Sequence, residues 1–118
     1  MVLAVHQIAI GEAFVLAEKL GLSAQSLFDV ITGATGNCWA VRTNCPVPGP
    51  VPTSPANNDF KHGFATALMN KDLGLAMDAV NSTGSTAPLG SHAADIYAKF
   101  ATTNADKDFS AIIETLRG

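Results

Sequence analysis

The sequence predicts an all-α domain, and three observations lead to that prediction. Apolar residues recur at three- and four-residue steps through most of the chain. No segment of useful length alternates apolar and polar residues as a half-buried strand does. The sequence also lacks the glycine-rich strand-turn-helix that cradles a phosphate. With 118 residues, the chain is expected to form a single domain over residues 1–118.

The first helix is expected from Met1 to Leu20, ending where Gly21 takes the left-handed conformation. It starts at full helical stride with no cap before Met1, so we expect the chain to be a fragment of a longer protein. Its apolar residues lie on nearly every face, and one small domain cannot bury them all. We therefore predict a homo-oligomer through this helix, which charged substitutions at Val5 or Ile8 would disrupt.

Two short helices and a proline-rich segment are expected next. Ser23 caps the first short helix, which ends at Gly33, and the second lies around residues 37–43. Five of the six prolines then fall within residues 45–58, where fixed φ angles and missing N–H donors exclude helix and central strand. This segment is either an ordered extended loop or a disordered linker.

The second half of the chain predicts three more helices. The first is expected over residues 64–81 and is broken by the polar residues 82–86. Pro88 suits the first turn of the next helix, since its missing N–H costs nothing there. A turn at residues 104–106 precedes a last helix that begins at Asp108.

Charge and cysteine usage exclude several classes of partner. The net charge is −3 and no basic run is present, so no nucleic acid partner is expected. Polar residues interrupt the first helix too often for a membrane span. Cys38 and Cys45 follow no metal-binding spacing, so no metal is expected, and reduced thiols are favoured over a disulfide. His6, His62 and His92 are interpreted as structural or solvated.

The helix over residues 64–81 poses the main functional question. Phe64, Lys71 and Asp78 are seven residues apart and so share one stripe, with Leu68 and Leu75 between them. A second apolar row on this helix is expected to face the core. The stripe with Lys71 then faces something else that is partly apolar and accepts a cation.

A plainer interpretation is that Lys71 extends past its apolar neighbours and pairs with Asp72 or Asp78 in solvent. Spacing alone leaves both interpretations open.

The run NCWAVRTNCPVPGPVPTSPANNDFKHGFATALMNKDLGLAMDAV resembles the C-terminal domain of the 3-hydroxyisobutyrate dehydrogenases, in the β-hydroxyacid dehydrogenase family. The likeness covers essentially the whole chain. It implies a multi-helix C-terminal domain of a β-hydroxyacid or 6-phosphogluconate dehydrogenase-like enzyme, without the Rossmann domain. Such a domain closes over the cofactor and substrate and forms the oligomer.

The resemblance also implies roles for single residues. Lys71 would point to the bound nicotinamide cofactor and substrate, Phe64 would line the nicotinamide end, and Asp78 would support Lys71. The family's KxxxN pair is absent from the sequence, so no catalytic residue is expected in this chain, which alone would be inactive. The implied cofactor is NAD, and NADP is not excluded because the ribose-reading residue belongs to the Rossmann domain.

The implied reaction is hydride transfer from 3-hydroxyisobutyrate to NAD in valine catabolism. Two alternatives stay open: a reductase of another short β-hydroxyacid, of the tartronate semialdehyde or glyoxylate type, and a purely structural helical dimerisation module. The CPVPG…SPAN loop resembles that of the 3-hydroxyisobutyrate dehydrogenases more than that of the tartronate semialdehyde or glyoxylate reductases. The expected location is a bacterial cytoplasm, or the mitochondrial matrix if the source is a eukaryote.

Overall fold

The computed structural model describes residues 1–61 and 63–118, so His62 lies outside the described residues. Helices make up all the regular structure in this part of the chain, apart from one isolated antiparallel bridge between Ala65 and Asp108. In chain order the elements are α1 (Val2–Lys19), α2 (Ala24–Thr32), α3 (Trp39–Arg42), the 3-10 helix η1 (Pro55–Asn58), α4 (Thr66–Thr83), α5 (Pro88–Asn104), the 3-10 helix η2 (Phe109–Ile112) and α6 (Ile113–Leu116).

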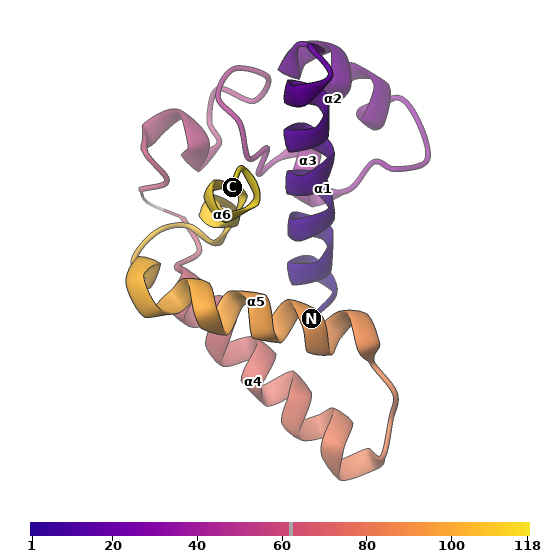
Figure 1. Ribbon diagram of the computed structural model, residues 1–118, viewed down its shortest axis with the longest axis vertical. Helices are drawn as coiled ribbons and strands as arrows, with labels where there is room; N and C mark the ends of the chain where they lie inside the picture. The colour runs from indigo at the N-terminus through magenta and orange to yellow at the C-terminus, as the bar shows by residue number, and fades with distance from the viewer. Residues whose placement is uncertain (62) are drawn as a thin grey trace.

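Helix α1 is the centre of an elongated molecule that measures 43 × 29 × 24 Å. Figure 1 shows α4 and α5 paired along each other at one end, while α2 and α3 lie at the other end. α1 runs between these two ends and contacts α5, α6, η2, α3 and α2. The N-terminus of α1 is therefore close to the α4–α5 pair.

About half of the circumference of α1 is buried within this one chain. Ile8 is only 7% exposed, and Val5 is half-buried. A charged residue at Ile8 would therefore disrupt the core before it affected any assembly, so Ile8 is the wrong position for that test. The exposed large apolar side chains of α1 are Val2 and Leu16, and Leu20 follows at its end.

The signals for helix ends were predicted correctly in the first half. Gly21 has φ +79°, and the Leu22 N–H donates to the Ala17 carbonyl 3.0 Å away, which closes α1. The Ser23 side chain accepts from the Ser26 N–H at 3.1 Å and caps α2. The third helix is shorter than expected, since α3 covers only Trp39–Arg42.

The proline-rich segment is an ordered loop with its own anchors. Cys45 and Val47 are buried. Asn57 joins two parts of the loop, because its Oδ1 accepts from the Gly49 N–H at 3.0 Å and its Nδ2 donates to the Val51 carbonyl at 2.8 Å. These contacts favour the ordered-loop alternative over the disordered linker.

α4 ends at Thr83, two residues beyond the predicted end at residue 81, and two further boundaries in the second half also differ from the prediction. α4 begins at Thr66, two residues after the predicted start, so Phe64 precedes the helix. The last predicted helix is divided into η2 and α6, and Asp108 caps η2 by accepting from the Ser110 N–H at 3.0 Å. These two further differences have one cause: the backbone around Phe64 pairs with the backbone around Asp108 instead of continuing as helix.

Candidate functional site

Helix α4 presents one apolar row to the core and another to solvent. Leu73 is fully buried, whereas Leu75, two residues later, is 60% exposed. The exposed row also contains Leu68, and Lys71 and Asp78 are exposed along the same helix. The prediction that α4 carries an outward row of apolar residues around a lysine is thus confirmed.

Lys71 has no ion-pair partner within the described residues. The ion pairs found there are Lys107–Glu114 at 2.7 Å and Glu18–Arg117 at 2.8 Å. Lys71 therefore pairs with neither Asp72 nor Asp78, and the ion-pair interpretation of this residue is not supported. Its ammonium group is left free for another negative partner.

Phe64 is positioned by tertiary contacts and does not belong to helix α4. The prediction that it shares the α4 stripe is wrong, since it lies before the helix and is half-buried. Its ring meets the ring of Phe109 edge-on, with centroids 5.6 Å apart and planes at 77°. Tertiary contact, and not helical spacing, determines its position.

The carboxylate of Asp108 holds the chain around Phe64. The Phe64 N–H donates to Asp108 Oδ2 at 2.8 Å, and the Phe109 N–H donates to the Phe64 carbonyl at 2.9 Å. The Asn44 amide donates to Asp108 Oδ1 at 3.2 Å, as the Ser110 hydroxyl also does. From the sequence, Asp108 was predicted only as a helix start, since its distant hydrogen-bond partners leave no local signal in the sequence.

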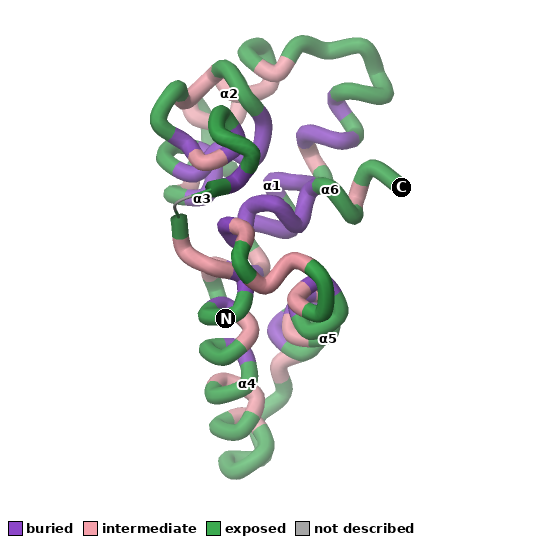
Figure 2. The backbone as a smooth tube through the Cα atoms, turned by 90° about the vertical axis from the view of Figure 1, so that its left-hand side faces the viewer, coloured by how far each residue is buried: buried purple, intermediate pink, exposed green. Residues whose placement is uncertain are grey.

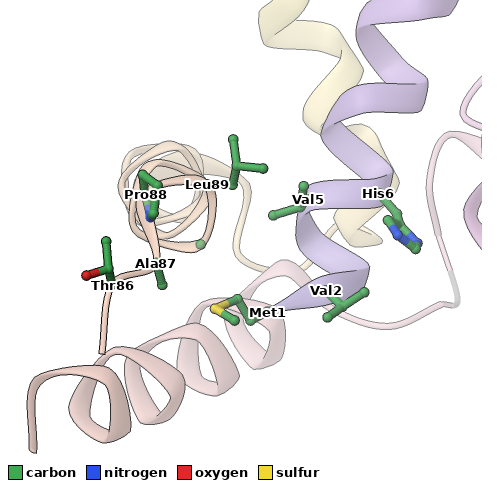
Figure 3. A pocket seen from close by; sticks show the side chains of 9 residues that line it. Met1, Val2, Val5, His6, Thr86, Ala87, Pro88 and Leu89 are labelled. Carbon is green, nitrogen blue, oxygen red and sulfur yellow. The ribbon is translucent and has the colours of Figure 1, made fainter. Parts of the chain in front are cut away.

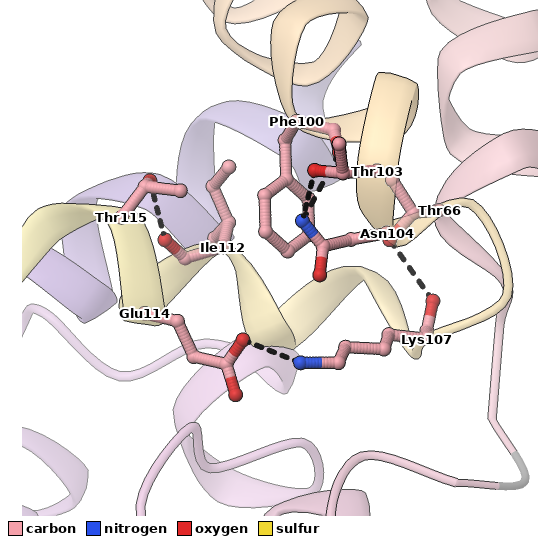
Figure 4. A network of polar contacts seen from close by, with 8 residues as sticks. All are labelled: Thr66, Phe100, Thr103, Asn104, Lys107, Ile112, Glu114 and Thr115. Carbon is pink, nitrogen blue, oxygen red and sulfur yellow. Dashed lines mark hydrogen bonds and ion pairs between the residues drawn. The ribbon is translucent and has the colours of Figure 1, made fainter.

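The first turn of α4 is anchored to the same segment. The Thr66 N–H and hydroxyl both donate to the Lys107 carbonyl, at 2.8 and 2.9 Å, and Figure 4 shows the hydroxyl bond. The Ala67 N–H donates to the Ala105 carbonyl at 3.0 Å. Donors that usually need a side-chain cap are therefore satisfied by a distant segment of backbone.

Two neighbouring apolar hollows lie between α1 and α5, away from Phe64, Lys71 and Asp78. The first, of about 380 Å³, includes the highly exposed side chains of Val2 and Leu89 (Figure 3). The second, of about 240 Å³, continues along the helices. Both contain few polar groups, so they fit an apolar partner better than a dinucleotide.

The cysteines and histidines offer no reactive site in the described part of the chain. Cys38 and Cys45 are free thiols, so the disulfide alternative is not realised. Burial raises the pKa of the Cys45 thiol, which disfavours the thiolate that nucleophilic chemistry needs. His6 and His92 are exposed and line separate hollows. No group of three potential metal ligands occurs among the described residues.

Comparisons with known proteins identify the family. A family model described as NAD-binding of NADP-dependent 3-hydroxyisobutyrate dehydrogenase matches residues 1–116. Proteins named probable 3-hydroxyisobutyrate dehydrogenase from Mycobacterium bovis and Mycobacterium tuberculosis are 88% identical over 117 residues. The mitochondrial 3-hydroxyisobutyrate dehydrogenase of Homo sapiens is 41% identical over 118 residues. The match covers 99% of this chain in each case, but 40% of the Mycobacterium proteins and 35% of the human one.

Solved structures show the same fold. A structure of Mycobacterium tuberculosis 3-hydroxyisobutyrate dehydrogenase with L-serine has a TM-score of 0.99 at 87% identity, over 100% of this chain and 40% of that one. A 3-hydroxyisobutyrate dehydrogenase from Salmonella typhimurium has a TM-score of 0.80 at 27% identity, over 95% of this chain and 37% of that one. Separately, none of the helices in the described residues is long and apolar enough to span a membrane.

One part of the predicted fold class is wrong. The family resemblance implied a C-terminal domain that closes over a cofactor held by a separate Rossmann domain, and this expectation is wrong. The matching family is instead defined by NAD binding, over nearly the whole chain. The missing cradle excludes one way of holding a pyrophosphate, but a dinucleotide also offers rings and riboses that helices can contact. The expected cofactor, NAD with NADP not excluded, is confirmed for the family. The chain belongs to the NAD-binding family of the 3-hydroxyisobutyrate dehydrogenases.

Proposed function

We propose that the chain forms part of the nicotinamide-dinucleotide site of an enzyme that oxidises 3-hydroxyisobutyrate in valine catabolism. The relatives' names and the 88% identity to the Mycobacterium proteins support this substrate over tartronate semialdehyde or glyoxylate. The same identity supports a bacterial cytoplasm as the location. The role of this chain is to bind the dinucleotide and to orient it and the substrate, and no catalytic residue is assigned to the chain.

The free ammonium group of Lys71 on an apolar face carries this proposal. Leu68 and Leu75 lie one turn before and one turn after it, and both are exposed. Such a surface suits a ligand with flat apolar rings and negative groups, and a dinucleotide and a hydroxyacid together supply both. Lys71 would contact the anionic part, and Phe64 would lie at the nicotinamide end.

Asp78 has a supporting role in this arrangement. It lies two turns beyond Lys71 and is exposed, without an ion-pair partner among the described residues. Its negative charge would help to orient the Lys71 side chain and would disfavour a ligand phosphate farther along α4. When bound, the nicotinamide accepts the hydride, and the residues of this chain set where that ring and the substrate lie.

The test is a Lys71→Ala variant. A charge-assisted hydrogen bond to a ligand is worth roughly 1.5–3 kcal/mol, so the affinity for NADP⁺ or NAD⁺ should fall about 10- to 150-fold. Unfolding by urea should change little, since an exposed lysine contributes at most about 0.5 kcal/mol. NMR titration of the chain with each dinucleotide measures even millimolar affinities.

Lys99→Ala is the matched control, because Lys99 is an exposed lysine on the neighbouring helix α5. Equal affinities in the unaltered chain and both variants would contradict the assignment of Lys71. Because the chain covers only 40% of the Mycobacterium dehydrogenases, we expect it alone to bind dinucleotide without oxidising 3-hydroxyisobutyrate. Sustained production of reduced nicotinamide by the pure chain would contradict this.

We also propose that the chain forms homo-oligomers through the hollows between α1 and α5. Val2 is 64% and Leu89 70% exposed, and both line the first of these hollows, whose exposed area is mostly apolar. A second copy of the chain, related by two-fold symmetry, would cover this surface on both copies at once. Light scattering after size exclusion should show a mass above 12.2 kDa, and Val2→Glu should lower it. Val30→Glu is the control, since Val30 is exposed on α2 at the other end of the molecule.

A further inference from the structure

The two carboxylate oxygens of Asp108 have different partners, although the residue is almost fully buried. Oδ1 accepts from the Asn44 amide at 3.2 Å, from the Ser110 N–H at 3.0 Å and from the Ser110 hydroxyl. Oδ2 accepts from the Phe64 N–H at 2.8 Å. One oxygen thus serves the segment that Asp108 itself begins, and the other reaches 44 positions back along the chain.

A helix cap needs only one of these oxygens. Oδ1 alone satisfies the Ser110 N–H at the start of η2, as an Asn or Ser cap would. The second oxygen is not explained by capping. A buried carboxylate is costly unless all its lone pairs are used, so the bond to Phe64 is an energetically important contact and not an accident of proximity.

Phe64 is held by this segment at three points. Its N–H donates to Asp108 Oδ2, its carbonyl accepts from the Phe109 N–H, and its ring packs edge-on against Phe109. α4 starts two residues later, with Thr66 bonded to the Lys107 carbonyl. Any shift of the Asp108 carboxylate would therefore move Phe64 and the first turn of the helix that carries Lys71.

We infer that Asp108 is a positioning residue for the dinucleotide: its Oδ2 fixes Phe64 and the start of α4, and thereby the surface that meets the cofactor. This inference rests on the proposed function of Phe64 and Lys71. Asp108 itself is too deeply buried to touch the ligand, so it acts only through Phe64 and the start of α4.

Gly63 provides independent support for a close fit at this point. A Cβ atom at Gly63 would lie 2.1 Å from Asp108 Oδ2 and 2.7 Å from its Cγ, far inside contact distance. Gly63 is itself exposed, so a side chain there would otherwise be tolerated. The backbone before Phe64 thus approaches the carboxylate as closely as a glycine allows.

The first test is Asp108→Asn. Three donors converge on Oδ1, so the asparagine carbonyl should stay there and keep the cap. Its NH₂ group then faces the Phe64 N–H, and two donors cannot bond. The variant should therefore keep η2 while it releases Phe64, which faster hydrogen exchange of the Phe64 amide would reveal.

Two further variants separate position from stability. In Gly63→Ala the added methyl group displaces the Asp108 carboxylate from the Phe64 N–H, while Asp108 itself is unchanged. Ser110→Ala removes a buried hydrogen bond to Oδ1 but leaves the Oδ2–Phe64 bond in place. Asp108→Asn and Gly63→Ala should each weaken NADP⁺ binding about tenfold, whereas Ser110→Ala should stay within about twofold of the unaltered chain.

A mutant cycle in the Phe64→Ala/Lys71→Ala background tests this mechanism. If Asp108 acts by positioning these two residues, Asp108→Asn should add less than about a twofold loss of affinity once the Phe64 ring and the Lys71 ammonium group are both gone. Full additivity would overturn the inference, as would unchanged affinity in a folded Asp108→Asn or Gly63→Ala variant. If neither Lys71→Ala nor Phe64→Ala changes the dinucleotide affinity, the proposed function is contradicted, and the inference with it.

Discussion

The two ends of α4 are held in different ways. At its start, the Thr66 and Ala67 N–H groups donate to carbonyls some 40 residues away in sequence, and the Phe64 N–H before it reaches the buried Asp108. At its end, the Thr83 hydroxyl bonds only to groups nearby in sequence, namely two carbonyls of its own last turns and the Ser85 hydroxyl. Figure 2 shows this far end mostly exposed. The start is placed by tertiary contacts, and the end follows from local helix geometry.

This difference matters for the residues proposed to meet the cofactor. At 1.5 Å per residue, Lys71 lies about 7–8 Å beyond the anchored Thr66, and Asp78 lies about 18 Å beyond it. A small tilt of the helix about its anchored start moves Asp78 more than twice as far as Lys71. The anchored end is thus the better place for a contact that must be precise, and the free end suits a supporting charge.

The largest expected effect comes from removing the anchor. Asp108→Ala leaves the Phe64 N–H, the Ser110 N–H and the Asn44 amide without their acceptor. Each buried donor left unpaired costs about 1–3 kcal/mol, so the free energy of unfolding should fall by roughly 3–9 kcal/mol. Ser82→Ala, which removes a local bond at the far end, should cost at most about 0.5 kcal/mol. Urea unfolding measures both, and equal losses would refute the contrast between the two ends.

A pair of leucines tests which face of α4 carries the packing. Leu73→Ala should cost about 2–5 kcal/mol, because a fully buried leucine leaves a cavity. Leu75→Ala removes the same atoms from a side chain that is 60% exposed and should cost less than about 1 kcal/mol. Thermal unfolding of the two variants checks the pair. Similar losses would mean that the exposed row is covered in solution, as it would be in an oligomer.

The end of α4 is closed by a glycine in the left-handed conformation, at φ +65°. A Cβ at Gly84 would meet nothing within 4 Å, so Gly84→Ala changes backbone strain and nothing else. The expected loss is about 1 kcal/mol, with no change in dinucleotide affinity. NMR titration and urea unfolding of this variant, beside Gly63→Ala, compare two glycine substitutions at opposite ends. A loss of affinity in Gly84→Ala would show that the far end also sets the binding surface.

Local features of the fold could be predicted from the sequence, and distant pairings could not. Ser23, Gly21 and Pro88 act within one turn of the chain, so their side chains and φ preferences reveal their roles. The buried and exposed rows of α4 follow from a period of 3.6 residues. The pairing of residues 64–66 with 107–109 has no such period, and it alone determines where α4 begins.

The candidate site also contains one residue with a local sequence signal and others that are positioned by long-range contacts. Lys71 drew attention because a cation in an apolar helical row is visible in sequence, but only the family resemblance gave it a proposed role. Phe64 was assigned to that row, whereas the structure holds it through Asp108 and Phe109. The Asp108 carboxylate was missed because its partners are separated from it by 44 and 64 positions. Long-range hydrogen bonds of buried groups leave no spacing pattern that a single sequence can reveal.

The smallest expected effect belongs to an exposed charge, in contrast to the buried one. Arg117 Nη2 lies 2.8 Å from Glu18 Oε1, and this bond joins the end of α1 to the last residues. The Arg117 hydrogen bond lowers the pKa of Glu18 below its usual value. The stabilisation from this ion pair is therefore complete above the unfolded pKa of about 4.3 and is lost as pH falls through the lower folded pKa.

The Glu18→Gln variant tests this ion pair. Both side chains are well exposed, so the substitution should lower the free energy of unfolding by no more than about 1 kcal/mol at pH 7. Urea unfolding at pH 7 and at acidic pH should show that the difference between variant and unaltered chain becomes smaller in acid. High salt at pH 7 should reduce it too, and a difference that persists under both conditions would mean that Glu18 acts through packing instead of charge.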